Sequence, residues 1–463
     1  NITTRSAAKT QGTLVALGGG NEERGISARS GGKGSDDSSY RIYGKYFERN
    51  DHRLASGATA RDGAGRWQAG FRTDWERATR SLTVQGDLYT GNVDNLGGAR
   101  DIAGGNVLAR WRAQTSADSE GMLLAYYDRT EREHAGSFRE KRDTVDVEYQ
   151  QAFHRLGRHE VVVGGGYRAS HDRTVNTPVL GFMPAERTLA LASLFAQDEV
   201  ALSAKLHATG GLRAERNSYT GVEWLPNLRL AYSFSPQHVA WAALTRTVRS
   251  PSRLDRDLVV PGMPPYVVVN NDGFKSEIAN VAEVGYRAQL APRVSVSLTA
   301  FHHQFHDLRT LEVAGPTLAF ANSGEGRTTG IEGWGDFAVA RDWRLVWGFT
   351  RLHEHYRIDP GHTDVQNNNL GNDPKLTASL RSLWNVTRGV ELDVAARYIA
   401  ALPNPRVPAH TVVDLRAGYR VSREVELSLL VGNLLNRRYS EIGTPAERAV
   451  FERTAFLKVT WTP

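Results

Sequence analysis

Two histidine clusters are the first residues in this sequence that could do chemistry. His302, His303 and His306 occur close together, and His353 and His355 flank a glutamate. Imidazole and carboxylate groups are common metal ligands, but they bind a metal only when they converge on one point. Because successive side chains of a β-strand point to opposite faces, His302 and His303 do not converge. Solvated histidines at strand ends are the simpler interpretation, and we predict no metal site.

The stretch 249–274 is the strongest candidate for a ligand-binding segment. It contains Arg249, Arg253 and Arg256, followed by a proline-rich run that ends at Tyr266. Guanidinium groups bind carboxylate or catecholate oxygens, and a tyrosine ring offers a stacking face. We therefore predict that these three arginines and Tyr266 bind substrate. The alternative is an ordinary mobile surface loop.

Nothing in the sequence assembles a catalytic site. The 463 residues include no Cys, which removes thiolate metal sites and cysteine nucleophiles. No Gly-x-Ser-x-Gly elbow occurs, and no Ser-His-acid set follows from spacing. The glycine clusters 18–20 and 164–166 precede no helix, so they do not predict phosphate binding. We predict no enzyme activity, no catalytic residue and no cofactor.

The elements that carry these residues alternate between apolar and polar positions. In 390–398, Val390, Leu392 and Val394 oppose Glu391, and in 411–420, Val413 and Leu415 oppose Asp414 and Arg416. This period of two indicates strands with one apolar and one polar face. We expect the five apolar residues to face lipid and the three charged ones to face a lumen.

Strand length and connections favour a membrane barrel over a soluble sandwich or propeller. Many segments run for about 9–14 residues, as tilted membrane strands require, and aromatic residues gather near segment ends. Tight connections such as 234–237, 291–293, 340–342 and 421–423 alternate with long ones at 171–187, 249–274, 354–373 and 435–449.

The fold class is therefore predicted as all-β, a transmembrane antiparallel β-barrel with short periplasmic turns and long extracellular loops. We count about 22 strands, the first beginning near Thr13 and the last near Arg453; three others are placed near Thr144, Asn227 and Gly330.

Composition supports this prediction by exclusion. Only 40% of residues are hydrophobic, and no window has the roughly 18 uninterrupted apolar residues of a membrane helix. The net charge of +6 comes from interspersed residues and not from basic runs, so no nucleic-acid partner is expected. The start at Asn1 shows no signal peptide, which leaves a mature chain or a fragment open.

Five segments, in this order, resemble those of TonB-dependent outer-membrane receptors, and the resemblance covers essentially the whole chain. The segments are Asn1-Ile-Thr-Thr-Arg-Ser-Ala7, Leu244-Thr-Arg-Thr-Val-Arg-Ser-Pro251, Asn271-Asp-Gly-Phe-Lys-Ser-Glu277 with Ala282-Glu-Val-Gly-Tyr286, Phe320-Ala-Asn-Ser-Gly through Thr329-Gly-Ile-Glu332, and Gly432-Asn-Leu-Leu-Asn-Arg-Arg-Tyr439.

The resemblance implies that residues 1–10 end a plug or linker, that 11–463 form the receptor barrel, and that the plug domain is missing from this chain. It implies a monomer in the outer membrane of a Gram-negative bacterium. Such a receptor imports a scarce nutrient, by default a ferric siderophore, with the TonB energy-coupling complex acting through the plug. Cobalamin, a saccharide or another metal chelate are alternative ligands. A passive porin-like pore and a lipid-modifying barrel enzyme are alternative functions.

Overall fold

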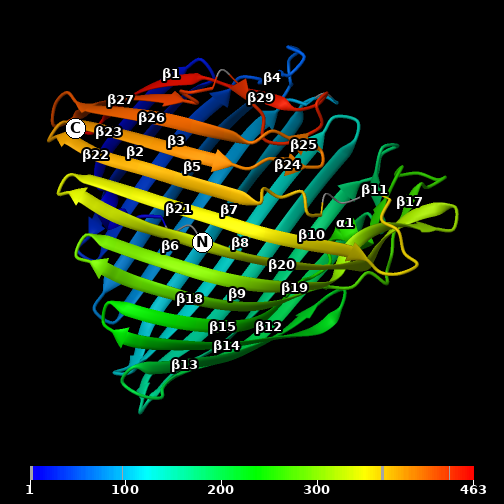
Figure 1. The fold of residues 1–463 in the computed structure, drawn as a ribbon, viewed down its shortest axis with the longest axis horizontal. Coiled ribbons are helices and arrows are strands. Elements are labelled where there is room, and N and C mark those ends of the chain that lie inside the picture. Colours follow the sequence, from blue (N-terminus) through cyan, green and yellow to red (C-terminus); the bar gives the residue numbers. More distant parts are fainter. Residues whose placement is uncertain (1–3, 96, 366–369, 437) are drawn as a thin grey trace.

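A closed antiparallel barrel forms the body of the molecule in a computed structural model that describes residues 4–95, 97–365, 370–436 and 438–463 (Figure 1). Within these residues 22 strands each pair with their neighbours, and the first pairs with the last through Leu17 and Val459. The predicted fold class and strand number are confirmed.

The strands of the wall are β1 (Gly12–Gly20), β2 (Glu23–Ser35), β3 (Ser38–Arg49), β5 (Ala64–Arg77), β6 (Arg80–Val93), β7 (Arg100–Ser116), β8 (Ser119–His134), β9 (Phe138–Leu156), β10 (His159–Val175), β12 (Glu186–Ala201), β13 (Leu206–Asn217), β14 (Gly221–Ser235), β15 (His238–Arg249), β18 (Glu277–Ala291), β19 (Val294–Ala314), β20 (Thr317–Ala340), β21 (Trp343–Ile358), β22 (Leu376–Thr387), β23 (Val390–Ile399), β26 (His410–Arg420), β27 (Val425–Gly432) and β30 (Thr454–Trp461).

Short elements occupy the connections and the N-terminal segment. They are η1 (Ala7–Thr10), β4 (Arg53–Leu54), β11 (Gly181–Phe182), α1 (Arg253–Arg256), β16 (Leu258–Val259), β17 (Val268–Val269), β24 (Leu402–Pro403), β25 (Arg406–Val407), β28 (Arg438–Tyr439) and β29 (Ala449–Glu452). No helix among the described residues is long and apolar enough to cross a membrane.

The long connections lie at one end of the barrel, and the tight turns that the sequence predicts lie at the other (Figure 1). The predicted tight turns lie at the end that also holds the C-terminus, which we call the short-turn rim. The connections 50–63, 176–185, 250–276 and 400–409 lie at the opposite end, the long-loop rim. The predicted segments 354–373 and 435–449 also belong to that rim, although residues 366–369 and 437 lie outside the described part of the chain.

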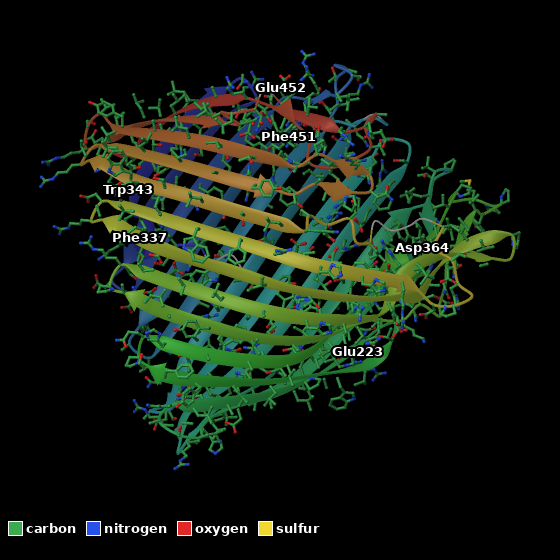
Figure 2. The ribbon with its side chains drawn as sticks, viewed as in Figure 1. Glu223, Phe337, Trp343, Asp364, Phe451 and Glu452 are labelled. Atoms are coloured by element: carbon green, nitrogen blue, oxygen red, sulfur yellow. The ribbon has the colours of Figure 1, made fainter. Side chains whose placement is uncertain are left out.

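Alternation along each strand separates an outward apolar face from a lumen face. On β14, Trp224, Leu228 and Phe234 are exposed apolar residues of the outward face, while Glu223 and Arg229 have the opposite parity. This arrangement lowers the free energy of the barrel in a membrane, because the apolar side chains of the outward face contact hydrocarbon and the polar side chains of the lumen face contact water. Figure 2 shows the side chains along the wall strands and on the connections at both rims.

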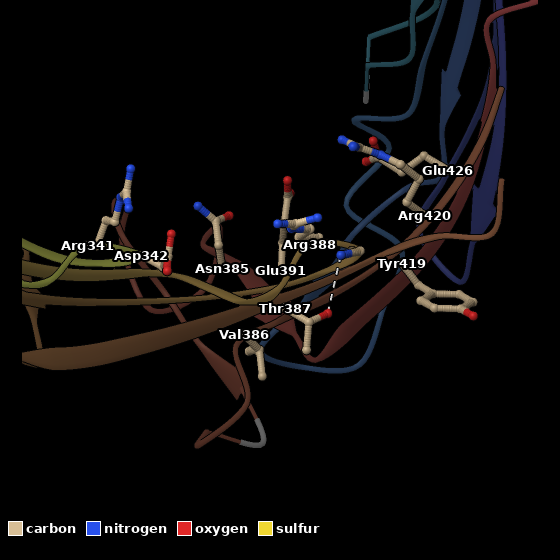
Figure 3. Close-up of a pocket in the computed structure, with 12 residues that line it drawn as sticks. Arg341, Asp342, Asn385, Val386, Thr387, Arg388, Glu391, Tyr419, Arg420 and Glu426 are labelled. Carbon is tan, nitrogen blue, oxygen red and sulfur yellow. Dashed lines mark hydrogen bonds between the residues drawn. The ribbon is translucent and has the colours of Figure 1, made fainter. Parts of the chain in front are cut away.

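The predicted facing of β23 and β26 is confirmed by register and ion pairs. Val394 pairs with Leu415 on one face, and Asp393 pairs with Arg416 on the other. Arg416 contacts Glu391 at 2.7 Å and Glu426 at 3.1 Å across the lumen side. Figure 3 shows the same separation, since Tyr419 points away from the wall on the side opposite Glu391 and Glu426. Val390, Leu392 and Val413 share the face of Val394.

Several strands begin earlier than predicted, and three of them differ by six residues or more. The strands expected near Thr144, Asn227 and Gly330 begin at Phe138, Gly221 and Thr317. All three begin at the long-loop rim, where the wall continues above the apolar belt. Outside lipid both faces of a strand meet water, so the alternation that marks a membrane strand disappears although the hydrogen-bonded ladder continues.

Candidate functional site

The connection 250–276 between β15 and β18 is the longest at the long-loop rim, and it contains the predicted substrate-binding residues. It begins with the single turn α1, where the carboxylate of Asp255 accepts hydrogen bonds from the backbone N–H and the hydroxyl of Ser252, each at 2.8 Å. A Ser followed three residues later by an acidic residue is a helix-start pattern, because the two side chains satisfy exposed backbone donors. The loop therefore has an ordered beginning.

Asp255 is also the centre of an ion-pair group, and it is only 1% exposed. Arg249 Nη1 lies 2.8 Å from Asp255 Oδ2, and Arg309 Nη1 lies 3.2 Å from Oδ1. Arg249 also pairs with Glu277 across the neighbouring strand. Burial alone raises the pKa of Asp255, but the hydrogen bonds from Arg249 and Ser252 outweigh it and hold this pKa below its usual value.

A second buried carboxylate, that of Asp257, joins its own loop to β12 and to the connection 218–220. It is 1% exposed and accepts hydrogen bonds from Arg187 at 2.6 Å, Arg253 at 2.9 Å and the Tyr219 hydroxyl at 2.9 Å. Burial, reinforced by the charge of Asp257, raises the pKa of the Tyr219 phenol, which stays protonated and donates.

Arg253 lies between two carboxylates and is only 4% exposed. Besides Asp257 it contacts Asp172 of β10 at 3.1 Å, it donates to the backbone oxygens of Pro184 and Ala185, and its guanidinium lies 5.0 Å from the centre of the Phe182 ring. Four of the five N–H donors of this buried guanidinium have protein partners, so Arg253 holds 250–276 onto the connection 176–185.

Arg256 and Tyr266 occupy different parts of the same loop. Arg256 donates from Nε and Nη2 to the backbone oxygen of Phe274, at 2.9 and 2.6 Å, and lies over the Tyr219 ring at 5.1 Å. Burial lowers the pKa of Arg256. Tyr266 is half-buried in the outer part of the loop, between the exposed Met263 and Val267. Among the four predicted residues Arg249 is exposed, with 44% of its side chain accessible, Arg256 and Tyr266 are half-buried, and Arg253 is buried.

The outer part of the loop is anchored by backbone pairing and an apolar cluster. Val268 and Val269 form the parallel strand β17 beside β20, and β16 pairs with β11. Phe274 is fully buried against Leu311 and Phe320. Gly262 packs so closely against the backbone oxygens of Thr177 and Leu180 that a Cβ there would overlap them. The loop is therefore a folded part of the rim and not a free excursion.

Several residues of this site were missing from the sequence prediction. Asp172, Arg187, Tyr219 and Arg309 complete the two carboxylate groups, yet Asp172 is 81 residues from Arg253 in the chain. Only the strand order of the wall brings their connections together. Asp255 and Asp257 themselves were visible as acids among the arginines, and that local mixture is the signal for internal pairing.

The histidine clusters do not form a metal centre in the described part of the chain, where no group of three or more acidic, His or Cys side chains is placed to hold an ion. His302 contacts the Thr329 hydroxyl at 2.8 Å. His303 has the opposite parity and lies between the rings of Phe301 and Phe305. The expected divergence of His302 and His303 is confirmed.

A polar cavity of about 900 Å³ lies at the short-turn rim (Figure 3). Its lining comes from three turns and includes Arg341, Arg388, Arg420 and Glu391. The chain before β1 is fastened to β5, because Asp74 accepts the backbone N–H of Ala7 at 2.6 Å and Arg72 donates to the Thr4 hydroxyl at 2.9 Å. Residues 1–3 of the predicted segment 1–10 lie outside the described residues.

These features define a class of protein, a membrane-spanning barrel whose long loops assemble an ordered structure at one rim. The family model for the β-barrel of TonB dependent receptor-like proteins matches residues 8–434, so this chain belongs to that family.

Two curated receptors match part of the sequence. The chain is 25% identical over 179 residues to the metal-pseudopaline receptor CntO of Pseudomonas aeruginosa and 23% identical over 179 residues to the catecholate siderophore receptor Fiu of Escherichia coli K12. The first match covers 36% of this chain and 25% of CntO, and the second covers 37% of this chain and 23% of Fiu. The matched segment is thus about a quarter of each curated relative.

Solved structures cover much more of the chain. The siderophore receptor PirA of Acinetobacter baumannii superimposes with a TM-score of 0.82 at 13% identity, over 100% of this chain and 81% of PirA. A variant of the ferric enterobactin receptor PfeA of Pseudomonas aeruginosa gives a TM-score of 0.80 at 14% identity, again over 100% and 81%. At these identities the likeness establishes the barrel fold.

Proposed function

We propose that this chain is the barrel of an active-transport receptor that captures a ferric siderophore at the outer surface of a Gram-negative outer membrane. The observation that carries the proposal is the ordered structure of the loop 250–276 in a barrel of this family. A ligand-binding surface gains affinity when it is ordered before the ligand arrives, because less conformational entropy is lost on binding. The siderophore class is suggested by the receptors CntO, Fiu and PirA, which the chain resembles.

Within this proposal the four predicted residues have two roles. Arg249 keeps its pairs with Asp255 and Glu277 and contacts anionic chelate oxygens through the exposed part of its guanidinium, while the Tyr266 ring stacks on a flat catechol. Arg253 and Arg256 are positioning residues, because their donors are engaged inside the rim. Residues 1–10 connect the barrel to a plug, residues 11–463 are the barrel, and TonB acts through the plug. The receptor works as a monomer in contact with outer-membrane lipid, without a cofactor or covalent chemistry.

Binding is tested by titrating the purified barrel with ferric enterobactin and following tryptophan fluorescence. We expect saturable quenching that is weakened on the order of tenfold in Y266A, in line with the loss of a stacking contact. As a matched control, Tyr419 is exposed on the outward face at the short-turn rim, so Y419A leaves binding unchanged. Equal quenching in both variants contradicts the assignment of Tyr266.

Transport is tested by iron-limited growth of cells that carry the receptor with its plug. Uptake that requires the inner-membrane energy complex supports the receptor. Uptake that continues without that complex, and that scales with solute size, supports the passive pore instead.

A further inference from the structure

A group of arginine and histidine side chains with no acidic partner among the described residues lies on the outward face of β15, β19, β20 and β21. Register places Arg246, Asn280, Gln304, Arg327 and His355 in one row across these strands. The row shares its face with exposed apolar residues of the membrane belt and lies toward the long-loop rim. We name the basic outer patch by its six cationic or imidazole side chains: Arg246, His302, Arg327, Arg351, His353 and His355.

The three arginines of this patch have no protein partner among the described residues. Arg246, Arg327 and Arg351 make no side-chain hydrogen bond, ion pair or ring contact there. The outward carboxylate two residues from Arg327 is that of Glu325, and it is already engaged by Arg357. An arginine that faces lipid without a counter-charge is unfavourable unless it reaches anionic headgroup oxygens at the membrane interface.

A second group of cations on the same outward surface is neutralised by acidic side chains of the barrel itself. On β8, β9 and β10, Arg129 contacts Glu131 at 2.8 Å, Lys141 contacts Glu131 at 3.3 Å, and Arg173 contacts Asp143 at 3.2 Å. These cations also lie just beyond the apolar belt, directly after Tyr127 along β8. The barrel therefore supplies acids to one group and leaves the basic outer patch without them.

An apolar hollow of about 410 Å³ adjoins the patch. Leu228, Leu244 and Ala282 contribute apolar surface to it, while Arg246 and Gln304 border it on the polar side. A site with acyl-sized apolar space next to guanidinium groups is complementary to a lipid with an anionic headgroup. Guanidinium donors match phosphate oxygens in geometry as well as in charge.

We propose that the basic outer patch binds an anionic lipid of the surrounding membrane, with its headgroup phosphates on Arg246, Arg327 and Arg351 and an acyl chain in the hollow. Asn280, Gln304 and the imidazoles supply further hydrogen-bonding groups at the headgroup level. The occupant is a membrane lipid and not a free anion, because the hollow beside Arg246 is apolar.

The test uses the purified 463-residue barrel in a zwitterionic detergent. It is titrated with lipid A, a bis-phosphorylated glycolipid, and with phosphatidylcholine, and native mass spectrometry counts bound lipid. The triple variant R246Q/R327Q/R351Q should bind lipid A at least about tenfold more weakly, because each interfacial cation contributes to attraction of anionic lipid. The matched variant R129Q/K141Q/R173Q should bind as the unmodified chain does.

Folding is checked by heat-modifiable migration in gels, and R246K/R327K/R351K provides a variant that keeps the charge and should retain most of the binding. If the glutamine triple does not fold, the single change R327Q at an exposed position makes the same comparison against R173Q. Unchanged lipid A binding in the first triple, or an equal loss in both triples, overturns the proposal. If inorganic phosphate alone displaces lipid A, the patch is a free-anion site and the proposal is overturned. If two copies of the chain cross-link through position 327, the patch is a contact between copies and the proposal is likewise overturned.

Discussion

At the scale of single residues, two buried carboxylates organise the long-loop rim. Asp257 faces Arg187 and Arg253 and accepts the Tyr219 hydroxyl. Asp257→Asn removes the charge and leaves two guanidinium groups facing a neutral amide. Breaking a buried pair in this way costs about 3 kcal/mol, at the lower end of the usual range because Arg253 keeps Asp172. We expect 250–276 to open and to be cleaved much faster in limited proteolysis of the folded barrel.

Asp272→Asn is the matched control for that prediction. Asp272 belongs to the same loop but is exposed, so its neutralisation should leave the cleavage rate unchanged. Equal protection of the two variants would show that Asp257 does not fasten the loop.

Asp255 gives the rim a defined dependence on acid. Its pKa is lowered in the folded state, so its stabilising contribution is present above the unfolded value of about 3.9 and is lost as the pH falls through the folded pKa. We expect the protection of 250–276 from hydrogen exchange, taken relative to the intrinsic exchange rate at each pH, to stay constant from neutral pH to about 4 and to fall only in stronger acid. In D255N the loop should exchange faster at neutral pH and lose this acid step. A loss of protection near neutral pH in the unmodified chain would contradict the assignment of this acid dependence to Asp255.

At the scale of elements, the loop and the wall are separable. The ladder between β15 and β18 runs to Arg249 and Glu277, so deletion of 253–268 removes the loop without removing a rung of the wall. Closure entropy changes slowly with loop length, and the shortened connection is therefore tolerated. We expect the barrel to keep its heat-modifiable migration while ferric enterobactin quenching disappears. Quenching that survives the deletion unchanged moves the binding surface to other loops of the rim.

At the scale of the whole molecule, the barrel is wider than its own side chains can fill. A closed wall of 22 strands encloses a wide lumen. In large barrels such a lumen is occluded by a plug or by a loop that folds inward. The loop 250–276 instead packs on its neighbours at the rim. We expect the 463-residue chain in a planar bilayer to give large, poorly selective conductance, and the receptor extended by a plug domain to be nearly closed. Small, selective conductance of the 463-residue chain would favour the porin function.

The sequence by itself determined the barrel, its strand number, the facing of its strands and the two kinds of connection. These follow from a period-two pattern in which lipid selects one face, as Val394 and Leu415 illustrate opposite Asp393 and Arg416. Lipid acts on every residue of the belt independently, so the signal is local and can be read along the chain.

Tertiary structure decided where the wall extends beyond lipid and which charges are free. β20 begins at Thr317 although apolar alternation is clear only from about Gly330, because hydrogen bonds to β19 extend the ladder into water. Arg253 is buried against Asp172, whereas Arg327 faces outward with no partner among the described residues. The acids beside Arg253 in the sequence indicate that it is paired, but they do not indicate Asp172, which lies 81 residues away. The partner of a charge is set by which strands the closed wall places side by side, and that order brings together residues far apart in the chain.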